Sequence, residues 1–330
     1  MKHFTIHTPF GELFASEECK DFAEFFIYNR PPRRRLTEEM TLQDLKVKDP
    51  NRNIESMCDG VNHLLETIRR GVPVVWDYWS EEEQAKNPEK KAGKLFYLPA
   101  GGVEKKPFVL ICAGGGYSSV CSIVEGFNTA RRINQLGYPA FVMNYRVGYE
   151  GLLPDPMEDV AQALKFIMGK AEEFGVLCED YAVTGFSAGG HLCASWGTDN
   201  VGYAAYGLPK PGALFPVYPV IDLTPMAEHG GTFVRTLGGP DVAAAIEKYS
   251  VCRHVWEGYP PTFSVHCIDD PVVPYEQSLI LQKELEDRGI AHAIKLGNVG
   301  GHGIGEGRGS DVEGWIDEAV VFWQKCIKGE

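Results

Sequence analysis

The chain has 330 residues, enough for one large domain with additions or for two domains. Apolar residues make up 44% of it and charged residues 23%, which is ordinary for a water-soluble globular protein. The net charge of −13 argues against a nucleic-acid partner, and the one basic run, at residues 33–35, lies between prolines and glutamates and predicts a solvated loop.

Cysteine usage and the N-terminus predict the compartment. Nine cysteines are scattered without a C-x-x-C pair or zinc-ligand spacing, and the first residues lack the apolar core and cleavage site of a signal peptide. No apolar run approaches the length of a membrane span. We therefore expect reduced thiols, a cytoplasmic location, no membrane partner, and no metal or other cofactor.

Residues 1–71 differ from the rest of the chain and predict an N-terminal helical extension. Residues 3–13 are expected to form a strand or hairpin. Three helices are expected after them, one from Ser16, one from Thr41 and one over residues 53–70. Because amphipathic helices need an apolar partner, we expect this extension to cap a pocket at the C-terminal edge of the following sheet.

Residues 72–330 predict an α/β catalytic domain, with a mostly parallel sheet and helices on both faces. Strands are expected at 72–79, 94–98, 108–112, 140–145, 181–186, 213–217, 262–268 and 292–296, the first two as an antiparallel pair. Helices are expected at 125–136, 157–174, 275–288 and 312–327. Residues 222–259 predict an irregular insert.

The stretch from Tyr181 to His191 contains Gly185-x-Ser187-x-Gly189, the pattern of a nucleophile elbow. A serine on a tight turn from strand to helix needs neighbours without bulk, and its hydroxyl then projects at a helix N-terminus. The pattern could arise by chance in a chain with 37 glycines. The strand expected before it and the small residues after it favour a nucleophile at Ser187.

A serine nucleophile needs a base and an acid that holds the base, each on a loop after a later strand. His302, in a glycine-rich loop after the last strand, fits the base better than His292, which lies inside that strand. For the acid, Asp270 is preferred to Asp269, because Pro271 confines Asp270 to an extended conformation.

The triple glycine after the strand at 108–112 predicts donors for a negatively charged oxygen. Its flexible backbone can turn N–H groups into a site, where the N–H of Ala188 would join them. A phosphate-binding loop is excluded, since no Lys-Ser/Thr follows the glycines. Tyr117, beside them, could offer a flat surface to a sugar ring.

Five stretches of the chain occur in the same order as in α/β-hydrolases. They are Ala113-Gly114-Gly115-Gly116-Tyr117, Asn144-Tyr145-Arg146 with Glu158-Asp159, Gly185-Phe186-Ser187-Ala188-Gly189-Gly190, Asp270-Pro271-Val272-Val273-Pro274 and Gly301-His302-Gly303. Over residues 72–330 the chain resembles the hormone-sensitive-lipase-like carboxylesterases, particularly bacterial acetyl and acetylxylan esterases.

The resemblance implies that Ser187 is the nucleophile, His302 the base and Asp270 its orienting acid. It also implies that Gly115, Gly116 and Ala188 form the oxyanion hole. The chain departs from the family at Ala113, where a histidine usually precedes the glycines and braces the loop. That departure puts the support of the loop in question more than the activity.

The expected function is a serine carboxylesterase that removes acetyl groups from small esters, with acetylated sugars or oligosaccharides as the candidate substrates. One alternative is a peptidase of the prolyl-oligopeptidase type, although the chain shows no repeats of a propeller domain. Another is a ligand-binding protein on a hydrolase scaffold, which would require that the nucleophile, the base or the acid be missing. The sequence leaves the alcohol part of the substrate and the oligomeric state open.

Overall fold

The computed structural model describes the chain except for residues 1–2, 30–35, 49–51, 103, 229–231 and 330. The basic run at residues 33–35 therefore lies outside the described residues.

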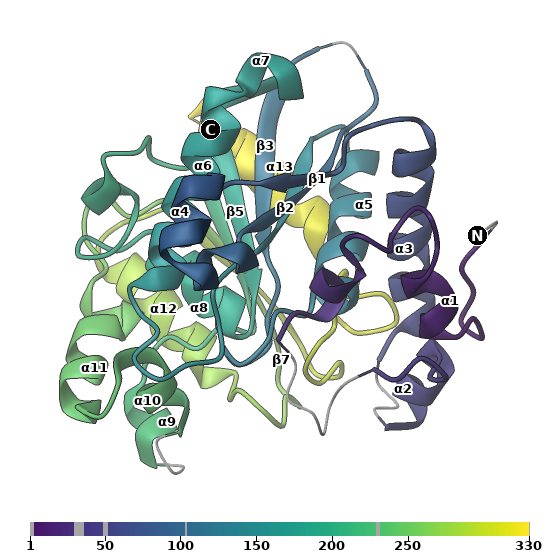
Figure 1. Ribbon diagram of the computed structural model, residues 1–330. Helices are drawn as coiled ribbons and strands as arrows, with labels where there is room; N and C mark the ends of the chain where they lie inside the picture. The colour runs from purple at the N-terminus through teal and green to yellow at the C-terminus, as the bar shows by residue number, and fades with distance from the viewer. Residues whose placement is uncertain (1–2, 30–35, 49–51, 103, 229–231, 330) are drawn as a thin grey trace.

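The predicted mostly parallel sheet is confirmed, and it has eight strands in the order β1-β2-β4-β3-β5-β6-β7-β8 (Figure 1). The strands are β1 (Val75–Asp77), β2 (Lys94–Leu98), β3 (Lys106–Cys112), β4 (Ala140–Asn144), β5 (Val176–Phe186), β6 (Ala213–Val217), β7 (Thr262–Cys267) and β8 (His292–Gly297). β2 pairs antiparallel with β1 and β4, while β4, β3 and β5 to β8 run parallel. The carboxyl ends of the parallel strands therefore meet at one edge.

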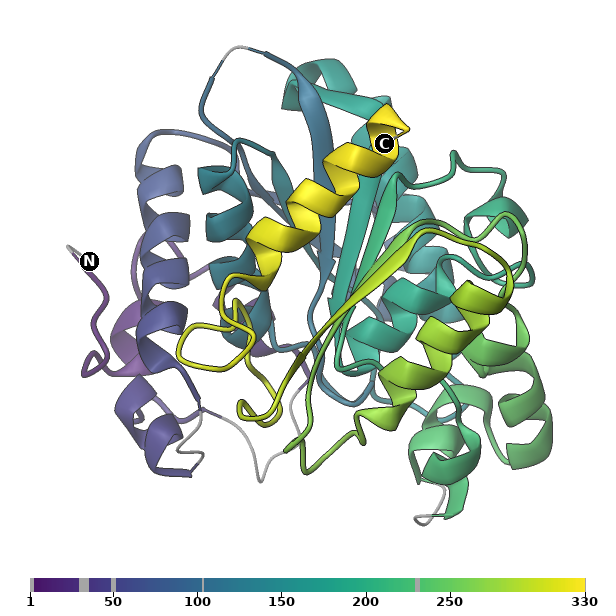
Figure 2. The same cartoon turned by 180° about the vertical axis from the view of Figure 1, so that it is seen from behind.

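Helices cover both faces of the sheet, and each face has its own buried core. β3 shows the alternation, because Leu110 packs into one core and its neighbour Ile111 into the other. Side chains of three helices pack into the first core: α6 (Asp155–Gly169), α8 (Ala188–Ser195) and α12 (Glu276–Asp287). The second receives α3 (Ile54–Arg69), α5 (Phe127–Gln135) and α13 (Trp315–Lys328), which crosses the sheet in Figure 2. Two shorter helices follow elements of this frame: α4 (Glu81–Lys86), which has no buried residue, and α7 (Ala171–Phe174), whose Phe174 is buried in the first core.

The N-terminal extension packs on the second face, where α3 lies beside α5 (Figure 1). The expected strand or hairpin at residues 3–13 is wrong: a turn at Thr5–Thr8 leads through Pro9 into α1 (Phe10–Phe14). Proline cannot donate to a strand ladder but fits the start of a helix, and this favours the observed form.

The helix expected from Ser16 is also wrong, since the structure has successive turns followed by the short 3-10 helix η1 (Ala23–Ile27). Hydrogen bonds reach back three residues, from Cys19 N–H to Ser16 and from Phe22 N–H to Cys19. This tighter winding brings Phe22 and Phe26 onto the aromatic rings of Phe96 and Phe127. The helix expected from Thr41 is present as α2 (Leu42–Lys48).

The segment at 222–259 is not irregular but carries short helices. They are α9 (Thr224–Glu228), α10 (Thr232–Gly238), α11 (Val242–Tyr249) and η6 (Val251–Arg253). Val234 and Leu237 are buried, and so are Ala245 and Tyr249, so the helical spacing was present but interrupted by Gly239-Pro240. The Asp241 side chain caps α11 by accepting a hydrogen bond from the N–H of Ala244 at 3.0 Å.

Within the described ranges, no helix is both long and apolar enough to cross a bilayer. All nine cysteines are free thiols.

The packing of the extension predicts that it shares one cooperative core with the sheet. Phe26 is fully buried against Phe96 and Phe127, so Phe26→Ala should lower the free energy of unfolding by about 3–5 kcal/mol. Urea denaturation followed by fluorescence measures this loss, with the exposed Val47→Ala as the control. A loss below about 0.5 kcal/mol would show that the extension docks without contributing to the core.

Candidate active site

Ser187 stands on a strained turn between β5, which ends at Phe186, and α8, which begins at Ala188. Its φ of 55° and ψ of −117° are rare for a residue with a side chain. A Cβ on Gly185 would lie 2.0 Å from the Gly189 carbonyl oxygen, and one on Gly189 would lie 2.1 Å from that of Cys112. Both glycines are therefore required by close backbone approach, as the elbow pattern predicts.

The structure brings Ser187, His302 and Asp270 together from three loops at the carboxyl edge of the sheet. Nε2 of His302 lies 3.0 Å from Oγ of Ser187, and its Nδ1 lies 2.7 Å from Oδ2 of Asp270. The Asp270 side chain is fully buried, whereas that of His302 is 18% exposed. An imidazole held between a hydroxyl and a buried carboxylate is arranged to take the hydroxyl proton.

The two neighbouring aspartates have different partners. Oδ1 of Asp270 accepts hydrogen bonds from the N–H groups of Val272 and Val273, which leaves Oδ2 for His302. Asp269 instead accepts from the N–H groups of Gly300 and Gly301, and so fixes the loop that leads to His302.

His266 in β7 is a second histidine at the Asp270 carboxylate. Its Nε2 lies 3.4 Å from Oδ2 of Asp270 and 3.0 Å from the carbonyl oxygen of Val273, and its Nδ1 lies 2.8 Å from the Ser278 hydroxyl. Burial raises the pKa of Asp270, but the bonds from His266, His302 and Val273 outweigh it and hold that pKa well below its usual range. Asp270 is therefore kept as a carboxylate.

The three residues predicted to form an oxyanion hole lie close to Ser187. Gly115 and Gly116 line the same pocket as Ser187 and His302, and Ala188 is the first residue of α8. Within the described chain, no acceptor takes a hydrogen bond from the N–H groups of these three residues. Gly115 has a φ of 144°, and a Cβ there would lie 2.0 Å from the Ser119 carbonyl oxygen, so only glycine fits.

A buried glutamate, Glu125, supports the glycine loop, which in this chain is preceded by Ala113 instead of the histidine usual in the related family. Its Oε2 accepts the N–H of Gly114 at 2.6 Å, and its Oε1 accepts the hydroxyl of Tyr218 at 2.8 Å. The Tyr218 ring in turn packs 4.6 Å from the His302 ring, centroid to centroid. Through Tyr218, Glu125 therefore links the glycine loop to the ring of His302. Burial raises its pKa, although the bonds from Gly114 and Tyr218 and the nearby His302 and Arg52 oppose the shift.

Further bonds hold the glycine loop from both sides. The Tyr145 hydroxyl donates to the carbonyl of Ala113 at 2.7 Å. Tyr28 of the extension forms an antiparallel bridge with Val120. Its two backbone hydrogen bonds have nitrogen-to-oxygen distances of 3.0 and 3.1 Å. The loop thus has a dense set of supports without the usual histidine, and these contacts could not be read from local sequence.

Tyr117 is not brought to the pocket wall, which corrects its expected role as a sugar-binding surface. Its side chain is fully buried, and its hydroxyl lies 2.9 Å from Nδ1 of His191. Nε2 of His191 lies 2.9 Å from the carbonyl oxygen of Tyr249, and burial lowers the pKa of His191 to about 4. Both residues pack beneath the site, as expected for His191.

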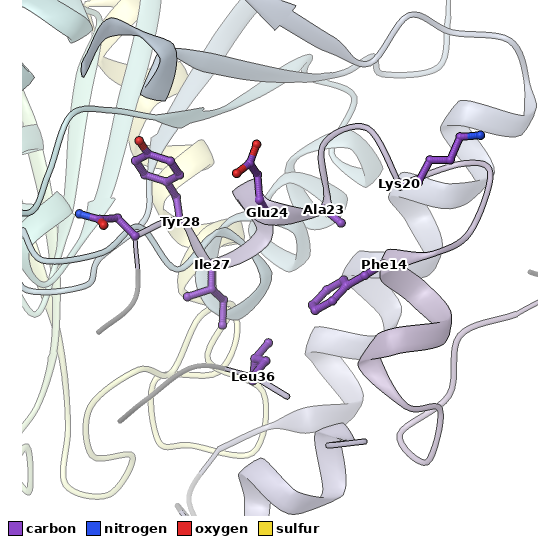
Figure 3. Close-up of a pocket in the computed structure, with 8 residues that line it drawn as sticks. Phe14, Lys20, Ala23, Glu24, Ile27, Tyr28 and Leu36 are labelled. Atoms are coloured by element: carbon purple, nitrogen blue, oxygen red, sulfur yellow. The ribbon is translucent and has the colours of Figure 1, made fainter. Parts of the chain in front are cut away.

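The pocket above Ser187 has a volume of about 560 Å³. Its wall combines the glycine loop, the loops of Asp269 and His302, and two residues of the extension, Leu45 and Arg52. The extension thus reaches the site although its bulk lies on the second face, and its role as a cap stays a prediction. Another hollow, of about 580 Å³, lies within the extension between α1 and η1 (Figure 3). Its described lining holds none of the three site residues.

Residues 96–285 match the model of the family described as BD-FAE. An endo-1,4-beta-xylanase B of Butyrivibrio fibrisolvens is 28% identical over 250 residues, 72% of this chain and 39% of that protein. An acetylxylan esterase of Xylanibacter ruminicola is 29% identical over 218 residues, 65% of this chain and 44% of that protein. The chain spans less than half the length of these two relatives.

Among solved structures, the acetyl ester-xyloside bifunctional hydrolase of Caldicellulosiruptor lactoaceticus is similar, with a TM-score of 0.65 and 26% identity. The match covers 76% of this chain and 95% of that one. The comparisons, which also match a hormone-sensitive lipase of Mus musculus at 27% identity over 145 residues, thus confirm the α/β-hydrolase fold and the resemblance to hormone-sensitive-lipase-like and acetylxylan esterases.

The lowered pKa of Asp270 predicts how stability depends on pH. Its contribution should be complete above about pH 3.9, the pKa in the unfolded chain, and be lost as pH falls toward the native value. Between these two pKa values, Asp270 should make the free energy of unfolding rise more steeply with pH, by at most about 1.4 kcal/mol per pH unit. Urea denaturation between about pH 2.5 and 5 should therefore give Asp270→Asn a flatter curve. Parallel curves for the two proteins would contradict the prediction.

The bonds of Glu125 predict that it positions the glycine loop. In Glu125→Gln one donor, from Gly114 or Tyr218, would face an amide N–H₂, so the loop should shift. We expect ester hydrolysis to lose about 10- to 100-fold in kcat with a smaller change in KM, because misplaced oxyanion donors weaken the transition state most. Glu172→Gln, at an exposed ion pair with Lys105, is the control. An unchanged kcat in a folded Glu125→Gln protein would exclude this role.

Proposed function

Because this chain belongs to the BD-FAE family and its relatives include carboxylic ester hydrolases, we propose that it is a serine carboxylesterase acting on short acyl esters. The observation that carries the proposal is the continuous path from Ser187 through His302 to Asp270, with distances of 3.0 and 2.7 Å, beside the glycine loop.

The first half of the reaction acylates the enzyme. His302 Nε2 takes the Ser187 proton as Oγ attacks the carbonyl carbon, and the N–H groups of Gly115, Gly116 and Ala188 stabilise the resulting oxyanion. The oxyanion collapses, the ester C–O bond breaks, and the imidazolium gives its proton to the departing alkoxide. Asp270 holds the imidazole and stabilises its positive charge.

The second half releases the acid. Water loses a proton to Nε2 of His302 and attacks the acyl carbon, and a second oxyanion forms at the same donors. When it collapses, the Ser187 oxygen leaves and recovers the proton from His302. The free enzyme and a carboxylic acid result, and no cofactor takes part in the steps proposed.

The side chains that line the pocket favour a substrate with a small acyl group. Beside the glycines, the pocket wall carries the short side chains of Ser118, Ser119 and Cys121, and its aliphatic residues are few and of moderate size. A long acyl chain needs a large apolar surface. The similar proteins include an acetylxylan esterase and an acetyl ester-xyloside bifunctional hydrolase. This similarity also supports acetyl esters of sugars as the substrates of this chain.

The two alternatives have less support. A ligand-binding protein would not need Ser187, His302 and Asp270 in hydrogen-bonding register. A peptidase of the prolyl-oligopeptidase type would be expected with a propeller of repeated four-stranded blades, and the described strands belong to one eight-stranded sheet instead.

The nucleophile is tested by Ser187→Ala, which should reduce hydrolysis of an aryl acetate by at least about 1,000-fold while leaving the fold intact. Circular dichroism and thermal unfolding check the fold. Ser80→Ala, at the exposed cap of α4, is the control that should retain activity. Near-wild-type turnover by Ser187→Ala would exclude the serine mechanism.

The acyl preference is tested separately with aryl esters from acetyl to octanoyl, alongside acetylated sugars. kcat/KM should be highest for acetyl or propionyl esters and fall steeply by octanoyl, since the wall carries few large aliphatic side chains to cover a long acyl chain. A preference for octanoyl, or no acetate released from acetylated sugars, would contradict the acetyl assignment but not the serine mechanism.

A further inference from the structure

We propose that Tyr117 and His191 form a buried clamp that sets the spacing between the two halves of the oxyanion hole. The inference rests on the proposed esterase function, and it assigns positioning roles to two buried side chains. The hole takes its N–H groups from two separate elements, since Gly115 and Gly116 lie in the glycine loop and Ala188 begins α8. These donors stabilise an oxyanion only when they converge on one atom.

The clamp is a side-chain hydrogen bond between these two elements. Tyr117 directly follows Gly116, and its hydroxyl lies 2.9 Å from Nδ1 of His191 in α8. The N–H of His191 donates to the carbonyl of Ser187 at 2.9 Å, so this histidine lies one helical turn from the nucleophile. A shift of the Tyr117 hydroxyl relative to His191 would therefore move the glycine donors relative to the N–H of Ala188.

The surroundings of His191 fix the direction of this bond. Its Nε2 lies 2.9 Å from the carbonyl oxygen of Tyr249, which can only accept, so Nε2 carries the ring proton. Burial lowers the pKa of His191 to about 4, and the ring is therefore neutral at neutral pH. Nδ1 is then an acceptor, and the Tyr117 hydroxyl donates to it.

The backbone of Tyr117 shows that its position is enforced. Its φ of 54° is rare for a residue with a side chain, and such strain persists only where the surroundings hold the residue in place. The carbonyl of Tyr117 accepts the N–H of Gly148 at 2.9 Å, and its ring packs against the rings of Tyr145 and Phe233. These contacts fix the ring, so its hydroxyl reaches His191 from a defined position.

The other supports of the glycine loop have a different direction. Glu125, Tyr145 and Tyr28 hold the loop to segments other than α8. Loss of the Tyr117 hydroxyl should therefore leave the loop ordered but change its distance from α8. The alternative is that the bond to His191 only stabilises the core, in which case the protein that stays folded would bind an oxyanion as tightly as before.

The test removes the hydroxyl and keeps the ring. Tyr117→Phe should lower kcat for an aryl acetate about tenfold with little change in KM, because misplaced donors weaken the transition state most. Tyr203→Phe, which removes a hydroxyl that donates to the carbonyl of Gly258 at 2.8 Å, is the matched control and should keep the wild-type kcat.

Inhibition by 1,1,1-trifluoropropan-2-one provides a readout of the oxyanion hole itself. Oγ of Ser187 adds to the carbonyl carbon of this ketone, the hydroxyl proton passes to His302, and the ketone oxygen becomes an oxyanion at the same donors. Tyr117→Phe should raise the inhibition constant by about the same factor of ten, and Tyr203→Phe should leave it unchanged. An unchanged constant in Tyr117→Phe would overturn the clamp even if kcat fell, because a smaller folded fraction lowers kcat without altering affinity.

A second variant tests whether the hydroxyl acts through His191. His191→Leu alone should also raise the inhibition constant, so either variant suffices if the other does not fold. In the His191→Leu background, Tyr117→Phe should lower kcat by less than about twofold more, and a full further tenfold loss would contradict the clamp. Wild-type protein that hydrolyses no acetyl ester would overturn the proposed function, and the clamp with it.

Discussion

The site depends on the close backbone packing that holds Ser187 in its strained turn. The carbonyl oxygens of Cys112 and Gly189 fill the space where side chains on Gly189 and Gly185 would stand, and the Ser187 N–H donates to Val217 at 3.0 Å. β3, β5 and β6 therefore meet at this turn. Because their order in the sheet is fixed, the loops after β7 and β8 bring Asp270 and His302 to the same edge.

A second set of contacts couples the glycine loop to His302 and to the extension. Glu125 holds Gly114 and Tyr218, whose ring packs on His302, while Tyr28 bridges to Val120 from residues 1–71. These interactions explain how the loop can keep its shape with Ala113 at the usual histidine position. They also tie the extension to the loop beside the proposed catalytic residues, whatever part it plays as a cap.

The sequence predicted the parts of the site that obey local rules. Ser187 lies in a turn that demands glycines, and Asp270 and His302 follow strands whose carboxyl ends share an edge. The contacts of Glu125 were not predicted, because they depend on which residues the fold places opposite it. The errors at residues 3–13 and 222–259 have a similar cause: Pro9 and Gly239-Pro240 interrupt the patterns, and tertiary packing decides the form of short segments.

The central claim is that acyl transfer passes through the hydroxyl of Ser187. The most direct test lets the enzyme react with an acetyl ester and stops the reaction with acid during turnover. Peptide mass spectrometry then locates any acetyl group that is bound to the protein. The account predicts an acetyl group on the peptide that contains Ser187, present only during turnover. An acetyl group on another residue, with Ser187 unmodified while the ester is consumed, would contradict it.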